Sequence, residues 1–396
     1  MSIFSGVFQE KELCGIQIDK FELNSNSKPK IFFLTHYHSD HIVGLNDLNY
    51  INYFNENDDV YLYCSEITKK LIKKNIVLNE KRIIIHEEGA VVICPNDEWI
   101  KVTALRAGHC PGSLMYLFES NISNVLFTGD FRLSMRDVKL CKSLKSIKLD
   151  KIYLDTTFAS PSYPSFPTRE ESFKCILKLI TNKEQEGNSV LFIIKLSANV
   201  GQEFLMVKIY EALGRKIYIE EKVAMNYTSS IKQLVNVVTP NPQETNIHFY
   251  FSENLIQEKA RKVVNAVIIK PTAQWFHRDN LINGPLQKDY SIWRVAYSSH
   301  SSLEELSEFV KYLKPAEIVP IAFANKVRIG KIGYTFEKMT VDEMLTEIQC
   351  NNSLHKCIRK REHENPLPNF KIAKKLKVGW EEELKIMNEL GELIVL

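Results

Sequence analysis

Three histidines and one aspartate lie within six positions in the segment HYHSDH, which follows the apolar run IFFL. They are His36, His38, Asp40 and His41. Imidazole nitrogens and carboxylate oxygens are the usual ligands of zinc and other first-row metals in hydrolases. Alternate residues of an extended or turning loop point the same way. His36 and His38 can therefore bind one ion together, while Asp40 and His41 turn toward a second.

Two further residues of ligand type lie at predicted strand ends. His109 in AGHCPGS follows one strand, and Asp130 in LFTGDFR ends another. A carboxylate there can bridge two ions, and water shared between two ions becomes a hydroxide nucleophile near neutral pH. A lone histidine such as His86 is more often a core residue than a ligand, but packing HYHSDH without a metal would leave several polar groups unsatisfied. The sequence predicts a dinuclear hydrolytic centre with the ligands His36, His38, Asp40, His41, His109 and Asp130.

Strands must position most of these residues. Before residue 156, short β-rich runs such as KIFFLTH, VYLYC, LMYLFE and NVLFTGD alternate with turns. After the proline-rich DTTFASPSYPSFPTREE, helical and strand patterns alternate, which predicts an α/β module. Thr168 with Glu171, and Ser302 with Glu305, have the spacing of capping boxes that begin helices.

The composition is that of an ordinary soluble globular protein, with 396 residues, 44% of them hydrophobic and 25% charged. This length allows two or three domains. No apolar run approaches the roughly 18 residues of a membrane span, and the first residues lack a signal-peptide pattern, so we expect an intracellular protein without a membrane partner. The eight cysteines are scattered without a Cys-x-x-Cys pair, which favours free thiols over a disulfide framework.

The net charge of +3 is too small to indicate a nucleic-acid partner by itself. Between Lys356 and Lys377, however, eight Lys and Arg residues stand against two Glu. Such a run can attract phosphate, or it can be a solvated basic tail. The patches CIRKRE and KIAKKLK in this stretch resemble weak nuclear-import signals.

The histidine and aspartate motifs resemble the signature of the metallo-β-lactamase superfamily, and Asp19 in GIQIDKF resembles its first-strand aspartate. AGHCPGSLMYLFE, NVLFTGDFRLS and KIYLDTTF are similar to the β-CASP nucleases, in which Asp155 and His300 match two added motifs. The third β-CASP position falls on Ile318 and Val319 in AEIVPI. An apolar residue there is similar to the DNA-processing members, and the DNA cross-link repair nuclease group resembles this chain most.

This resemblance implies an α/β fold, namely a metallo-β-lactamase αββα sandwich with an inserted β-CASP α/β domain. We expect residues 1–155 to form the first part of the metallo-β-lactamase domain and 156–299 the β-CASP domain. Residues 300–345 would return to the metallo-β-lactamase domain, and 346–396 would form a basic C-terminal extension.

The resemblance also implies a zinc-dependent DNA nuclease acting in the nucleus at hairpins, overhangs or 5′ ends, in double-strand break or cross-link repair. One Zn²⁺ would be bound tightly and a second divalent ion, Zn²⁺ or Mg²⁺, more loosely. The implied partners are DNA with single-strand/double-strand junctions or hairpins, and a repair kinase and ligase. The alternatives are a 5′ exonuclease of cross-link repair, a β-CASP RNA-processing endonuclease, a small-molecule hydrolase, or a scaffold without activity.

Four residues receive catalytic roles in this interpretation. Asp40 would orient the attacking water, and His300, oriented by Asp155, would donate a proton to the leaving oxygen or anchor a phosphate. Asp19 would fix the geometry of the ligands. Positively charged side chains bind phosphates, and aromatic side chains stack on unpaired bases. For Trp275, a position in the core is the alternative. The candidate DNA contacts are Lys195, Ser197, Arg132, Lys270 and Trp275.

Overall fold

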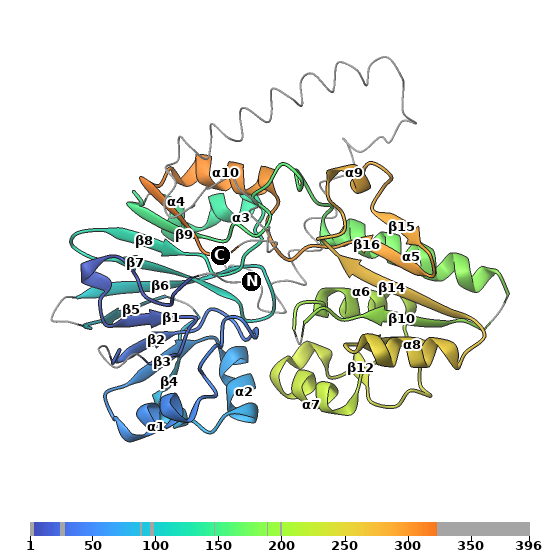
Figure 1. The fold of residues 1–396 in the computed structure, drawn as a ribbon, viewed down its shortest axis with the longest axis horizontal. Helices are drawn as coiled ribbons and strands as arrows, with labels where there is room; N and C mark the ends of the chain where they lie inside the picture. The colour runs from blue at the N-terminus through green and yellow to red at the C-terminus, as the bar shows by residue number, and fades with distance from the viewer. Residues whose placement is uncertain are drawn as a thin grey trace, which may run out of the picture.

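The computed structural model describes residues 4–23, 28–87, 89–95, 99–145, 147–187, 189–198 and 200–322, which form two lobes (Figure 1). The predicted extension 346–396 lies outside the described residues, as does the end of the return segment. Among the described residues, no helix is both long and apolar enough to span a membrane.

The first lobe contains a four-stranded parallel sheet in the order β1-β2-β3-β4. Helices α1 and α2 connect its strands and cover its outer face (Figure 1). The apolar side of α1 buries Tyr50 and Phe54 against this sheet. The elements are β1 (Ile16–Ile18), β2 (Ile31–Phe33), α1 (Leu48–Glu56), β3 (Tyr61–Cys64), α2 (Glu66–Asn75) and β4 (Ile83–Ile85), with short 3-10 helices at Lys11–Leu13 and Glu80–Arg82.

The second sheet of this lobe has six strands in the order β17-β9-β8-β7-β6-β5. Strands β5 to β8 are antiparallel, whereas β9 runs parallel to both β8 and β17. Helices α3, α4 and α10 cover the outer face (Figure 1). The elements are β5 (Ala90–Ile93), β6 (Ile100–Arg106), β7 (Leu114–Glu119), β8 (Asn124–Phe127), α3 (Met135–Leu140), α4 (Lys142–Lys145), β9 (Lys151–Leu154), α10 (Leu303–Leu313) and β17 (Glu317–Pro320).

The inner faces of the two sheets pack on each other through aromatic side chains. The ring centroid of Phe33 on β2 lies 4.8 Å from that of Tyr116 and 5.4 Å from that of Phe118, both on β7. Burial of such rings is the main stabilisation of a two-sheet core. With helices on both outer faces, this is the predicted αββα sandwich, and the fold prediction is confirmed.

The second lobe is built on a seven-stranded sheet in the order β12-β11-β13-β10-β14-β16-β15, parallel except for β15. Alternate residues of β10 face opposite sides: Ile193 packs with α8, whereas Phe192 and Ile194 pack with α5 and α6. The elements are α5 (Arg169–Gln185), β10 (Leu191–Lys195), α6 (Glu203–Leu213), β11 (Ile217–Tyr218), α7 (Glu221–Ser230), a 3-10 helix at Lys232–Leu234, β12 (Val238–Thr239), β13 (Ile247–Tyr250), α8 (Glu253–Arg261), β14 (Ala266–Thr272), α9 (Arg278–Leu281), β15 (Leu286–Asp289) and β16 (Ile292–Ala296).

Two helices that lie beside the site begin with the predicted capping boxes. Thr168 and Glu171 exchange hydrogen bonds at the start of α5, and Ser302 and Glu305 do so at the start of α10. After the seven-stranded sheet, α10 and β17 return to the first lobe, where β17 pairs with β9 and Ile318 is fully buried. We propose the domain limits 155/156 and 299/300 on the basis of this path.

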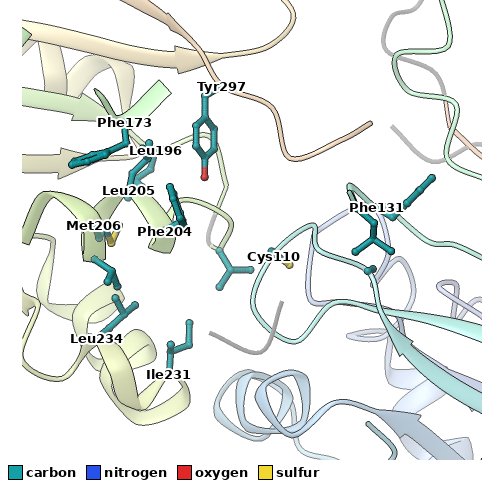
Figure 2. Packing of buried hydrophobic residues seen from close by; sticks show 14 of the residues in the cluster. Cys110, Phe131, Phe173, Leu196, Phe204, Leu205, Met206, Ile231, Leu234 and Tyr297 are labelled. Carbon is teal, nitrogen blue, oxygen red and sulfur yellow. The ribbon is translucent and has the colours of Figure 1, made fainter. Parts of the chain in front are cut away.

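One apolar cluster extends from the first lobe into the second. It includes Phe131 beside the six-stranded sheet, Cys110 in the β6–β7 loop, and Phe204 and Leu205 of α6. Figure 2 shows the turn that carries Cys110 between the two groups of side chains. The lobes therefore share a core, which fixes their relative position at the site.

Candidate metal centre

The predicted ligands come from loops that lie directly beyond strands of the two inner sheets. The HYHSDH segment follows β2, His109 lies in the loop between β6 and β7, and Asp130 follows β8. Asp155 directly follows β9, and His300 precedes α10. Five chain segments that are far apart in the sequence therefore contribute to one edge of the sandwich.

One carboxylate oxygen, Oδ2 of Asp130, lies at the middle of the cluster. It is 3.4 Å from Nε2 of His41 and 3.5 Å from Nε2 of His109. It is also 3.7 Å from Nε2 of His36 and 3.9 Å from Nε2 of His300. An acceptor surrounded in this way can serve as a bridging ligand, as the sequence predicted.

Four of the predicted ligands meet the spacing that a metal ion requires. Ligand atoms of His36, His38, His109 and Asp130 all lie within 4.8 Å of one another. Nδ1 of His38 is 2.9 Å from Nε2 of His36 and 3.1 Å from Nε2 of His109. Tetrahedral ligands about 2 Å from a zinc ion are about 3.3 Å apart. The donor set therefore fits zinc in both chemical type and separation.

Each histidine of the cluster is tied at its other ring nitrogen to an acceptor that is not a ligand. His38 Nε2 donates to the carbonyl of Val200 (2.8 Å), and His109 Nδ1 donates to that of Ser299 (3.0 Å). His36 Nδ1 donates to the hydroxyl of Thr35 (3.0 Å). Such bonds fix the tautomer and leave the opposite nitrogen available to a metal.

His41 is held by Asp19. Its Nδ1 donates to Oδ2 of Asp19 (2.8 Å), which also accepts from the hydroxyl of Thr35 (2.6 Å), while Oδ1 of Asp19 accepts from the Thr35 backbone N–H (2.7 Å). Asp19 has a φ of 54°, a left-handed conformation that costs an L-residue about 1 kcal/mol or more. These bonds hold it there. The buried Nε2 of His41 has no hydrogen-bond partner, which is the state expected of a metal ligand.

The electrostatics of the site favour neutral rings at His36, His38 and His109 beside an ionised carboxylate. At His41, in contrast, the effect of burial is outweighed by Asp130 and Asp19, which raise its pKa well above the usual value. Burial lowers the pKa of His36 and of His109 well below the usual value, and it also lowers that of His38. Although burial opposes ionisation of Asp130, His41 and the other neighbouring imidazoles hold its pKa well below the usual range. Metal binding needs neutral imidazoles and ionised carboxylates.

Asp155 and His300 are hydrogen-bonded neighbours. Oδ2 of Asp155 accepts from Nδ1 of His300 (2.8 Å), and Asp155 also accepts from the backbone N–H groups of Phe131 (3.3 Å) and Thr157 (2.9 Å). Burial lowers the pKa of His300, but Asp155 and Asp130 outweigh this effect and raise it. His300 thus presents Nε2 toward Asp130 from an imidazole whose orientation is fixed.

A pocket of about 370 Å³ opens beside the cluster, between the two lobes. Asp40 lies on its wall with 34% of its side chain exposed, and its carboxylate is 4.0 Å from Nε2 of His41. Asp40 is therefore beside the four-ligand group rather than within it. The opposite wall carries three of the predicted DNA contacts: Lys195, Ser197 and Lys270.

The other two predicted DNA contacts are placed elsewhere. Arg132 is 6% exposed, and its guanidinium pairs with Glu305 (3.0 Å) and donates to the carbonyl of Ser298 (3.0 Å). This placement corrects the prediction for Arg132, because a buried, paired guanidinium supports the His300 segment and does not reach a substrate. Trp275 is partly buried, packs against Arg294 (5.1 Å) and does not line the pocket.

Sequence reasoning missed several residues that hold the ligands, including Val200, Ser299 and Arg169. The first two act through backbone carbonyls, which any residue type supplies, so no sequence signal marks them. Gly129 could have been found, because it directly precedes Asp130. It has a φ of +50°, and an added Cβ would lie 2.8 Å from Cγ2 of Thr35.

Comparison with known proteins also indicates a relation to DNA repair proteins. Residues 232–326 match the family described as DNA repair metallo-beta-lactamase. "Protein artemis" of Rattus norvegicus is 30% identical over 97% of this chain and 56% of that protein, and "Protein artemis" of Homo sapiens is 32% identical over 83% and 50%. "DNA cross-link repair 1A protein" of Homo sapiens is 29% identical over 77% of this chain and 29% of that protein.

The chain spans about half the length of the artemis proteins that it matches. This chain also matches a solved structure of a protein of unknown function from Enterococcus faecalis V583. The match covers 81% of this chain and 83% of the solved chain, with 16% sequence identity and a TM-score of 0.46. The family match, the artemis relatives and the residues gathered around Asp130 identify the chain as a member of the DNA repair metallo-β-lactamase family, close to artemis.

Proposed function

We propose that the chain is a zinc-dependent nuclease that hydrolyses DNA phosphodiesters at hairpins, overhangs or 5′ ends during repair of double-strand breaks or cross-links. The convergence of five imidazoles on the Asp130 carboxylate, beside a pocket with lysines on its far wall, carries this proposal. The names of the artemis and cross-link repair relatives support DNA as the substrate. Nuclear localisation is part of this proposal, because the DNA repair relatives suggest action in the nucleus.

His36, His38, His109 and Asp130 would hold the first metal ion, and Asp40, His41 and the shared Asp130 a second. Bound there, the ions would acidify a water molecule and neutralise charge that develops on a phosphoryl group. The proposed metals are Zn²⁺ at the first position and Zn²⁺ or Mg²⁺ at the second.

The chain's own side chains supply orientation and proton transfer. Asp40 lies on the pocket wall, where its carboxylate can accept a hydrogen bond from the attacking water and align it with the phosphorus. Asp155 fixes Nδ1 of His300, so that Nε2 faces the pocket and can deliver a proton to the leaving oxygen. Thr35, through Asp19, keeps His41 in place.

Lys195, which pairs with Glu253, and Lys270 line the pocket across from this chemistry and would provide positive charge for the phosphates on either side of the cut. Ser197 provides a hydroxyl on the same wall, oriented by a hydrogen bond from Gln202 (3.1 Å). Trp275 lies outside this pocket and is retained only as a proposed contact for a longer strand. A repair kinase and a ligase remain the proposed protein partners.

One assay tests the proposal. Purified protein is given 5′-phosphorylated single strands, closed hairpins and matched RNA, each with and without a chelator. We expect DNA cleavage that the chelator abolishes and that Asp40→Asn removes while the circular dichroism spectrum is unchanged. Cutting that survives chelation, or no cutting beside an active control nuclease, would refute the proposal.

A 5′ exonuclease of cross-link repair is the second candidate, because DNA cross-link repair 1A protein is among the relatives. Stepwise digestion from the 5′ end without hairpin opening would favour it. An RNA-processing endonuclease is disfavoured by the apolar Ile318 and Val319, which are buried in β17. RNA cut well ahead of DNA would reverse that order.

A further inference from the structure

We propose that two buried residues of the second lobe, Arg169 and Glu203, are positioning residues of the metal centre. Arg169 would fix the loop that carries His109, and Glu203 would fix the turn that orients His38. The inference rests on the metal site of the proposed function and is independent of the substrate. It makes metal affinity a property of both lobes.

Arg169 is the first residue of α5 and is 2% exposed. Its Nη2 donates to the carbonyl of Gly108 at 2.6 Å and lies 3.5 Å from the carbonyl of His109. Hydrogen bonds from charged donors are about twice as strong as neutral ones, and burial strengthens them further. The backbone on both sides of the His109 peptide is therefore held from the second lobe.

Ser113 and the Ser299 carbonyl also hold this loop, and Arg169 holds it from α5. The backbone N–H groups of His109 and Cys110 both donate to Oγ of Ser113, at 3.1 and 3.2 Å. His109 Nδ1 donates to the carbonyl of Ser299 (3.0 Å). Removal of the guanidinium would free the Gly108 carbonyl and allow the loop to shift away from the other ligands.

Glu203 is fully buried at the start of α6, and its Oε2 accepts from the backbone N–H of Gly201 at 2.6 Å. Gly201 follows Val200, whose carbonyl accepts from Nε2 of His38. Because this carbonyl binds Nε2, the other ring nitrogen of His38, Nδ1, faces the other ligands. Glu203 therefore holds the Val200–Gly201 backbone that orients the predicted ligand His38.

The two anchors are close to each other inside the molecule. Arg169 acts on the Glu203 carboxylate electrostatically, and a Cβ added to Gly201 would lie 3.9 Å from Cβ of Cys110, beside His109. Figure 2 shows the turn that carries Cys110 beside the group of side chains that includes Phe204 and Leu205. A change in the angle between the lobes would therefore displace His38 and His109 together.

The test measures the zinc affinity of the full chain, after removal of metal, by competition with a chromophoric chelator in the absence of DNA. Glu203→Gln is the reference, because its amide oxygen still accepts from Gly201. Arg169→Met combined with Glu203→Gln removes the contact to the His109 loop without leaving an unpaired buried charge. Glu203→Met removes the acceptor for Gly201. Arg215→Met is the matched control, since Arg215 pairs with Glu184 in the same lobe and touches no ligand segment.

Loss of a residue that supports metal ligands typically weakens metal binding by about 10- to 100-fold. We expect weakening of this size in the double variant and in Glu203→Met, with Glu203→Gln and Arg215→Met close to wild type. Zinc affinity within about threefold of the reference in a folded double variant would overturn the inference. If the double variant does not fold, an unchanged affinity in Glu203→Met overturns it instead. If the wild-type chain binds no zinc, the proposed function fails rather than this inference.

Discussion

Replacement of Glu203 by glutamine should change the pH dependence of stability in a way that the structure predicts in sign and size. Burial raises the pKa of the Glu203 carboxyl from 4.5 to about 7, although the N–H of Gly201 and the charge of Arg169 partly offset the effect. The side chain has no exposed surface. Ionisation of this group therefore costs the folded state more than the unfolded state.

Because the folded-state pKa is above the unfolded value, the folded protein binds the extra proton between these two pH values. The contribution of Glu203 to the free energy of unfolding is therefore fully present below pH 4.5 and is lost as the pH rises through about 7. Each pKa unit corresponds to about 1.4 kcal/mol, so full ionisation of Glu203 costs about 3 kcal/mol. Glutamine keeps the acceptor for Gly201 and does not titrate. The difference in free energy of unfolding, variant minus wild type, should rise by about 2.5 kcal/mol between pH about 5 and pH about 8.

Urea denaturation of the metal-free chain at several pH values measures this difference, with circular dichroism and tryptophan fluorescence followed together to verify two-state unfolding. Other titrating groups are common to both proteins and cancel. Glu258→Gln is the control: Lys262 lowers the pKa of the Glu258 carboxyl from 4.5, so this group is ionised in both the folded and the unfolded state above that pH, and its difference curve should be nearly flat between pH about 5 and pH about 8. A curve for Glu203→Gln that is flat, or that falls with pH, would refute the reasoning.

Four further outcomes are expected. His38→Ala should abolish cleavage and leave the circular dichroism spectrum unchanged; near-normal cutting would remove this residue from the metal centre. Gly129→Ala should lower the free energy of unfolding by about 2 kcal/mol, because alanine is strained at the φ of +50° and its Cβ would contact Thr35; an unchanged urea midpoint would contradict this. Lys270→Met should reduce the slope of log binding constant against log salt for DNA by about one, measured without turnover. Arg132→Met should leave that slope unchanged and lower the free energy of unfolding by about 3 kcal/mol, since it breaks a buried ion pair; a reduced slope would restore Arg132 as a DNA contact.

The local elements that hold the site could be predicted from the sequence. Strand-forming runs end at the HYHSDH segment, at Asp130 and at Asp155, and the structure has strands ending there. The capping boxes at Thr168 and Ser302 also begin helices as expected. These features depend on residues within a few positions of each other, so the spacing of residue types is sufficient to reveal them.

Predictions for the DNA contacts were less successful because exposure is not a local property. Arg132 carries the charge of a phosphate contact, yet its partner Glu305 is 173 positions away and draws it into the interior. Lys195 and Lys270 have the same residue character and do reach the pocket. Only the packing of α10 on the six-stranded sheet distinguishes these cases.

The sequence by itself determined which side chains are available for metal chemistry and that most of them follow strands. The tertiary structure alone decided which nitrogen of His38 and of His109 faces the other ligands. His38 is oriented by a carbonyl 162 positions away, His109 by one 190 positions away, and the loop of His109 by a guanidinium 61 positions away. Backbone carbonyls carry no residue-specific signal, and such distant contacts form only when the two lobes pack. The ligand types are therefore encoded locally, whereas their orientation belongs to the assembled fold.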